Sequence, residues 1–175
     1  MPVQPEFHFD FGSPNAYLSH RVIPGIEART GTVFAYVPVL LGGLFKATGN
    51  KSPMEMFGGI KNKPDYHRRE TERFLARHNI TEYARNPQFP VNTLLIMRAA
   101  IVAEDEGRLP EYVDAVYKCL WAQGGKMDDP EVAANALSAA GFDGPALLTR
   151  TQEPEIKAKL VANTEACLLY TSPSP

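Results

Sequence analysis

The sequence predicts an α/β protein that begins with a parallel βαβ unit and continues as a long, all-helical region. Two observations lead to this fold class. Strand-type alternation or β-branched composition occurs twice near the N-terminus, at residues 7–11 and 32–39, with a helix-type pattern between them. After the second of these segments, the regular spacing of apolar residues is helical. Two strands joined by a helix are expected to lie parallel, with a right-handed crossover.

The N-terminal unit starts with the stretch FHFDF, in which the three phenylalanines share one side of a strand. The glycine that follows ends this strand. Ser13 and Pro14 then form a strong helix start, because a hydroxyl caps free N–H groups and proline loses no hydrogen bond at the first position. Gly31 is the expected left-handed cap of this helix. The stretch TVFAYVPV, rich in β-branched and aromatic residues, predicts the second strand.

Helical patterns follow along most of the remaining chain. The stretch SPMEMFGGIKNK is expected to be irregular, and NPQFP is expected to be a loop. Start and stop signals such as Asp-Pro at the beginning and glycine at the end mark several of the helices. The expected helices span residues 40–49, 64–78, 91–106, 110–123, 128–141, 145–151 and 154–165.

Composition and charge exclude several classes of function. The formal net charge of -2 argues against a broad surface for nucleic acid or acidic membranes. No apolar run approaches the ~20 residues that span a bilayer, and no secretory signal pattern opens the sequence, so a cytoplasmic location is expected. Cys119 and Cys167 are too far apart for a Cys-x-x-Cys pair, and no metal site is expected. Cys119 lies in an apolar pattern typical of a small core residue.

Ser13 is the first candidate site residue, because a strand that ends at a helix start commonly presents chemistry. Backbone N–H groups and the helix dipole favour negative charge there. The hydroxyl could only cap the helix, could be a nucleophile, or could donate a hydrogen bond to a bound thiolate and lower the pKa of that thiol. A serine nucleophile needs a histidine as its base and an acid that orients the histidine, and the sequence pattern identifies no such pair. Capping and thiolate stabilisation are compatible.

Several stretches occur in a specific order along the chain: FDFGSPNAYL, PVLLGGLFKATGN, KPDY, FPVNTLLIMRA, LWAQGGKMDDPEVAANALSAAGFD and KAKLVANTEA. Together they resemble the 2-hydroxychromene-2-carboxylate isomerases, relatives of the kappa-class glutathione transferases in the DsbA-like branch of thioredoxin-fold proteins. The resemblance covers residues 7–166. It implies a thioredoxin-like N-terminal βαβ unit at residues 1–40, followed at residues 41–166 by a helical insertion domain and the next helix.

The C-terminus departs from that family pattern. In the family, the segment after NTEA continues to a Gly-Val-Pro-Thr motif, a cis-proline strand, a further strand and a last helix. Here CLLYTSPSP follows NTEA instead. We therefore expect the C-terminal ββα half to be missing and residues 167–175 to form a non-native or disordered tail. The missing half would include a strand beside FHFDF and part of the family's glutathione contacts.

The resemblance also assigns roles to residues. Where DsbA-like oxidases carry Cys-x-x-Cys, this chain reads SPNA, so dithiol redox chemistry is excluded by residue type. The resemblance implies that Ser13 is catalytic and binds the thiolate of the cofactor glutathione. It implies further glutathione or substrate contacts from Lys46, Asn50 and Lys63. Each lysine could instead be a solvated surface amine, and Asn50 could be a turn residue. Arg98 is either a buried ion-pair partner or a substrate contact.

The implied activity is the glutathione-dependent cis–trans isomerisation of 2-hydroxychromene-2-carboxylate in the degradation of aromatic compounds. Its partners would be a small aromatic substrate and, at full length, a second copy in a homodimer, with no nucleic acid and no membrane. Two alternatives stay open: a kappa-type transferase that conjugates glutathione to electrophiles, and an incomplete domain without a competent site.

Overall fold

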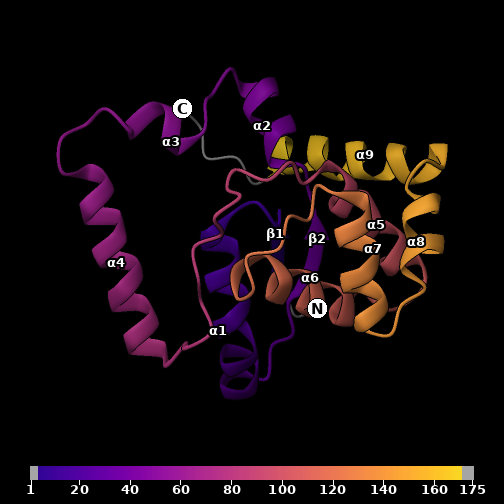
Figure 1. The fold of residues 1–175 in the computed structure, drawn as a ribbon, viewed down its shortest axis with the longest axis horizontal. Helices are drawn as coiled ribbons and strands as arrows, with labels where there is room; N and C mark the ends of the chain where they lie inside the picture. Colours follow the sequence, from indigo (N-terminus) through magenta and orange to yellow (C-terminus); the bar gives the residue numbers. More distant parts are fainter. Residues whose placement is uncertain (1–3, 171–175) are drawn as a thin grey trace.

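The computed structural model describes residues 4–170 as a small parallel sheet surrounded by helices (Figure 1). The predicted class, an α/β fold with a βαβ start and a helical remainder, is confirmed. In chain order the elements are β1 (Glu6–Phe9), α1 (Pro14–Thr30), β2 (Ala35–Pro38), α2 (Leu41–Thr48), α3 (Pro53–Phe57), α4 (Lys63–His78), α5 (Leu94–Asp105), α6 (Leu109–Trp121), α7 (Pro130–Ala139), α8 (Gly144–Arg150) and α9 (Pro154–Tyr170).

The sheet consists of β1 and β2, which run parallel as expected, with Glu6 opposite Ala35 and Phe9 opposite Pro38. Within the described residues β1 pairs with β2 alone. The first strand is shorter than its sequence pattern, because the chain leaves the ladder after Phe9. The loop that follows turns directly into α1, so the carboxyl end of β1 presents the start of this helix.

Helix α1 begins and ends where the sequence predicts. The Ser13 hydroxyl oxygen accepts a hydrogen bond from the backbone N–H of Ala16 at 3.2 Å, and Pro14 occupies the first helical position. Gly31 ends the helix at φ 70°, where its N–H donates to the carbonyl of Glu27. A side chain at this left-handed position would be strained, which is why glycine stands there.

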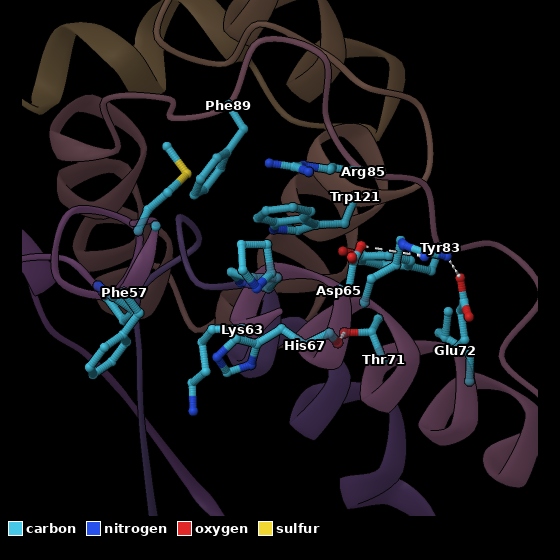
Figure 2. A pocket seen from close by; sticks show the side chains of 17 residues that line it. Phe57, Lys63, Asp65, His67, Thr71, Glu72, Tyr83, Arg85, Phe89 and Trp121 are labelled. Atoms are coloured by element: carbon cyan, nitrogen blue, oxygen red, sulfur yellow. Dashed lines mark hydrogen bonds and ion pairs between the residues drawn. The ribbon is translucent and has the colours of Figure 1, made fainter. Parts of the chain in front are cut away.

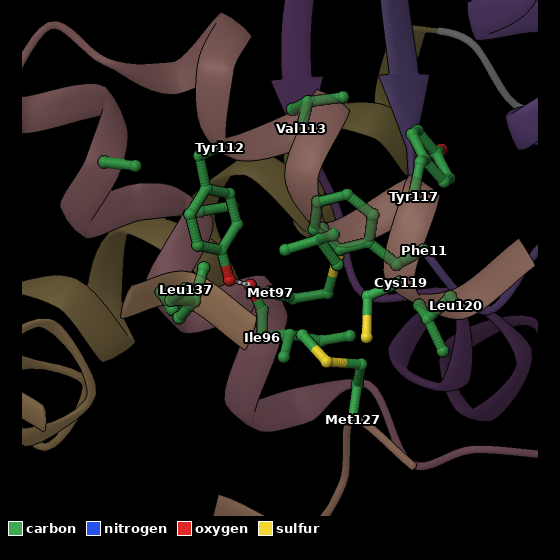
Figure 3. Close-up of a cluster of buried hydrophobic side chains, with 14 of the residues drawn as sticks. Phe11, Ile96, Met97, Tyr112, Val113, Tyr117, Cys119, Leu120, Met127 and Leu137 are labelled. Atoms are coloured by element: carbon green, nitrogen blue, oxygen red, sulfur yellow. Dashed lines mark hydrogen bonds between the residues drawn. The ribbon is translucent and has the colours of Figure 1, made fainter. Parts of the chain in front are cut away.

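The core lies between the sheet and the helices α5, α6 and α7, and Figure 3 shows part of it. Phe11, Met97 and Tyr117 are essentially inaccessible to solvent. The Tyr112 hydroxyl is buried with them and donates to the carbonyl of Ile96 at 2.8 Å. A buried hydroxyl without a partner would be costly, so this bond lets a large aromatic side chain fill the core.

Helices α3 and α4 form an arm, residues 52–78, that extends from the body of the protein (Figure 1). Neither helix contains a buried residue, although Phe74 and Leu75 of α4 pack against the core. The expectation that residues 52–63 are irregular is wrong for α3. Ser52 and Glu55 form a capping box there, which stabilises a short helix.

Helix α9 covers β2, α2 and α5, and it continues to Tyr170 rather than ending near residue 165. The side-chain amide of Asn163 donates to the carbonyl of Pro38 at 3.1 Å, which ties this helix to the end of β2. Helix α9 therefore runs across residue 166, where the resemblance places a boundary. Residues 167–170 are helical, Cys167 is buried, and the rest of the predicted tail, residues 171–175, lies outside the described residues. Among residues 4–170, no helix has the length and apolar character needed to cross a membrane.

Candidate functional site

A cleft of about 670 Å³ separates the arm from the body of the protein (Figure 2). This volume lies within the roughly 300–1,000 Å³ that is typical of small-molecule sites. One wall belongs to the arm and includes Met54, Phe57 and Lys63. The opposite wall includes Pro14, at the start of α1, and Trp121, at the end of α6. The start of α1 therefore lies against a cavity large enough for an organic ligand.

The body wall of the cleft is aromatic. The rings of Tyr83 and Trp121 are stacked, with centroids 6.1 Å apart and an angle of 10° between their planes. Phe89 lies 5.8 Å from Trp121 at an angle of 48°. The indole Nε1 donates to the carbonyl of Phe11 at 2.8 Å, which fixes the orientation of the ring. An aromatic ligand can pack against this wall without breaking the hydrogen bond of the indole.

Ser13 precedes Pro14 and is half-buried. Its oxygen already accepts the Ala16 N–H, so the cap uses one lone pair and leaves the hydroxyl proton available as a donor. No acidic residue stands in the first turn of α1, so within that turn no side chain offsets the positive end of this 17-residue helix. The arrangement favours an anion beside Ser13.

Asp10 is a site residue that the sequence interpretation did not single out. Its carboxylate is buried and accepts backbone N–H groups from Gly12 and Leu41, each at 2.8 Å, and it also bonds the side chain of Thr93. Burial raises the pKa of Asp10, although these three hydrogen bonds oppose the shift. One side chain thereby ties the loop that carries Ser13 to the start of α2. An acidic residue two positions before Gly-Ser-Pro was the available signal.

The structure brings only one of the predicted binding residues to the cleft. Lys63 lines it, with its ammonium 5.5 Å from the ring of Phe57 and 5.8 Å from that of Tyr66. Lys46 lies in the last turn of α2 and Asn50 follows that helix. Both are exposed and neither lines the cleft. Their roles in ligand binding stay predictions.

The remaining candidates from the sequence lie away from the cleft. Arg98 is half-buried on α5 and does not line it. Both cysteines are buried, as predicted for Cys119. Burial raises the pKa of the Cys119 thiol, which makes it a poor nucleophile. Within residues 4–170, no group of three or more histidine, cysteine or acidic side chains could hold a metal ion.

The sequence interpretation also missed the residues of the aromatic wall. Tyr83, Phe89 and Trp121 come from a loop and from the end of α6, and nothing local in the sequence pairs these segments. The available signal was that Trp121 is the only tryptophan of the chain. Arg85, between two of these residues in the sequence, lines the cleft as well.

Comparisons with known proteins identify the family of the chain and two related proteins. A model of the DSBA-like thioredoxin domain matches residues 6–170. A 2-hydroxychromene-2-carboxylate isomerase of Sphingobium xenophagum is 26% identical over 151 residues, which span 85% of this chain and 74% of the relative. A solved selenomethionine 2-hydroxychromene-2-carboxylate isomerase matches with a TM-score of 0.78 and 21% identity, over 94% of this chain and 78% of that one. The resemblance stated from the sequence is confirmed at the level of fold and distant homology.

Proposed function

The chain belongs to the DsbA-like thioredoxin domain family, and from that premise we propose that it is a glutathione-dependent isomerase of the 2-hydroxychromene-2-carboxylate type. The observation that carries the proposal is the start of α1. A serine stands where the family's oxidases have cysteine, its hydroxyl proton is available, and the next residue lines an aromatic cleft. The distant relation to an isomerase of this type supports the same activity.

The start of α1 fits the thiol of glutathione. Both cysteines of the chain are buried, so a sulfur nucleophile in the cleft has to come from a ligand. When bound, glutathione supplies a thiolate that can add reversibly to an electron-poor carbon and allow rotation about a former double bond. Ser13 would donate a hydrogen bond to the sulfur, and the N-terminal end of α1 would favour its ionised form.

The other residues of the cleft would bind and orient the substrate. The half-buried rings of Tyr83 and Phe89, which both pack on Trp121, offer an apolar surface to a bicyclic aromatic compound. Lys63, on the arm, would stabilise negative charge that develops on the substrate oxygen. Asp10 would keep the loop of Ser13 in position through its bond to the N–H of Gly12.

The test is the substitution Ser13→Ala, assayed with 2-hydroxychromene-2-carboxylate in the presence and absence of glutathione. We expect turnover that requires glutathione and falls roughly 10²- to 10³-fold in the variant, the usual loss for one donor that stabilises developing charge. Ser52→Ala is the matched control, because Ser52 also caps a helix with its hydroxyl, but it donates its proton to the Glu55 carboxylate at 2.7 Å and so offers no donor to a thiolate.

Other outcomes would contradict the proposal in distinct ways. Turnover that persists without glutathione would show that glutathione is not the cofactor. Equal losses in both serine variants would show that Ser13 acts only as a helix cap. Turnover of chlorodinitrobenzene without any turnover of the chromene would favour a kappa-type transferase. No glutathione binding by calorimetry would mean that this chain lacks a competent site.

A further inference from the structure

We propose that Arg85 is the carboxylate-binding residue of the cleft and selects aromatic acids over neutral aromatic compounds. This inference rests on the proposed function for the identity of the natural substrate. It adds a residue that the sequence motifs do not assign, and it names the chemical group that this residue recognises. The argument starts from the charges along the cleft.

Among the cations that line the cleft, two arginines differ in their partners. The guanidinium of Arg68 forms ion pairs with Asp65 at 3.6 Å and with Glu72 at 3.0 Å, so two carboxylates of the arm neutralise it. The exposed guanidinium of Arg85 makes no hydrogen bond or ion pair with any residue in the described range 4–170. Arg85 therefore offers its full set of donors to a ligand.

The backbone around Arg85 is held on both sides by the end of α6. The N–H of Ala84 donates to the carbonyl of Trp121 at 2.6 Å. The amide of Asn86, a side chain only 2% exposed, donates to the carbonyl of Leu120 at 2.9 Å. Because the backbone on both sides is already fixed, binding of a ligand has to order only the side chain of Arg85.

The same hydrogen bonds connect Arg85 to the start of α1. Trp121 accepts from Ala84 through its carbonyl and donates through its indole to Phe11, two residues before Ser13. Figure 2 shows the Arg85 side chain along the aromatic wall, with its guanidinium toward Phe89 and Trp121. An anionic group bound by Arg85 would thus be attached to a ring that packs on this wall.

The shape of the guanidinium selects a carboxylate. Its planar fork of N–H donors matches the two oxygens of a carboxylate in a bidentate pair, whereas an ammonium acts as a point charge. The other unpaired cation, Lys63, stands on the arm and is held over the rings of Phe57 and Tyr66. The geometry assigns the carboxylate to Arg85 and leaves Lys63 to other oxygens of the ligand.

The experiment compares binding of 2-naphthoate and 2-naphthamide, which share a bicyclic ring and differ in charge. Binding is followed by calorimetry and by the fluorescence of Trp121, the single tryptophan, which lies in the cleft. We expect the unmodified protein to prefer the naphthoate by roughly ten- to a hundredfold, the range for hydrogen bonds to charged groups. Arg85→Gln should abolish this preference, and Arg85→Lys should restore part of it.

Arg69→Gln is the control, because it removes the same charge from an exposed arginine of α4 that does not line the cleft. It should keep the preference for naphthoate. A preference that survives in Arg85→Gln, or an unmodified protein that binds both probes equally or binds neither, would overturn the inference. Thermal unfolding of each variant checks that the fold is intact.

Failure of this inference and failure of the proposed function are separable. If isomerase turnover is absent but the naphthoate preference depends on Arg85, the carboxylate site stands and the proposed activity falls. If turnover requires glutathione and Ser13 while Arg85→Gln leaves the KM for the chromene carboxylate unchanged, the proposed activity stands and the role of Arg85 falls.

Discussion

Trp121 donates a hydrogen bond from its indole Nε1 to the carbonyl oxygen of Phe11, across 110 positions of sequence. Both groups are buried, so the bond is shielded from competition by water. It joins the end of α6 to the loop that presents Ser13. The aromatic wall of the cleft and the start of α1 are therefore parts of one rigid unit, whereas the arm supplies the facing wall.

Trp121→Phe tests this connection. The variant keeps an aromatic ring but leaves the carbonyl of Phe11 buried without a partner, which costs roughly 1–3 kcal/mol. We expect the free energy of unfolding, measured by urea denaturation with circular dichroism, to fall by about this amount. Tyr83→Phe is the control, because the Tyr83 hydroxyl forms no hydrogen bond within residues 4–170. A loss below about 0.5 kcal/mol in Trp121→Phe would contradict a stabilising role of the indole bond.

Asp10 predicts a pH dependence of stability. Burial raises the pKa of Asp10 above its ordinary value, so between these two values the native state binds more protons than the unfolded state. The contribution of Asp10 to the free energy of unfolding is fully present below about pH 4, and it is lost as the pH rises through the pKa of Asp10 in the native state.

Asp10→Asn removes that titration. Urea unfolding of both proteins between about pH 4 and 8 should show the free energy of unfolding of the unmodified protein, minus that of the variant, decreasing as the pH rises. The slope cannot exceed about 1.4 kcal/mol per pH unit for one group. A difference that grows with pH would mean that the bonds from Gly12, Leu41 and Thr93 outweigh the burial of the charge.

Thr164 anchors α9 to the segment between β2 and α2. Its hydroxyl oxygen accepts from the N–H of Leu40 at 3.0 Å and its proton goes to the carbonyl of Leu160 at 2.7 Å. Thr164→Val keeps the shape but leaves that N–H unpaired, so thermal unfolding should reveal a loss of roughly 1–3 kcal/mol. Thr48→Val, at an exposed hydroxyl that bonds within its own helix, should change stability by less than about 0.5 kcal/mol. A small effect at both positions would contradict the anchoring role.

Replacement by alanine is expected to change stability in opposite directions at Gly144 and Gly42. A Cβ at Gly144 would overlap the carbonyl oxygen of Ala134, so Gly144→Ala should destabilise the packing of α8 on α7 by roughly 1–3 kcal/mol. A Cβ at Gly42 in α2 meets open space, so Gly42→Ala should stabilise by about 0.5–1 kcal/mol through helix propensity. Differential scanning calorimetry should place the two melting temperatures on opposite sides of the unmodified protein. The same sign for both would refute the packing argument at Gly144.

Local signals in the sequence were sufficient for most elements of the fold. Ser13, Pro14 and Gly31 mark the two ends of α1, because caps act through the nearest backbone groups. The parallel pairing of β1 and β2 followed from the length of the connection between them. Helix α3 was missed although Ser52 and Glu55 stand at capping-box spacing, since Gly-Gly and the lysines nearby favoured an irregular segment.

The sequence by itself determined most elements of this protein, its helix start at Ser13 and, through collinear motifs, its family. Only the tertiary structure decided which residues share the cleft. Tyr83, Arg85 and Trp121 reach Pro14 because buried hydrogen bonds join segments far apart in the chain, and periodicity carries no information about such pairs. For the same reason the sequence could not show that Lys63 lines the cleft and that Lys46 and Asn50 do not. Helical spacing predicts which residues share one face of a helix, but only tertiary packing determines what that face contacts.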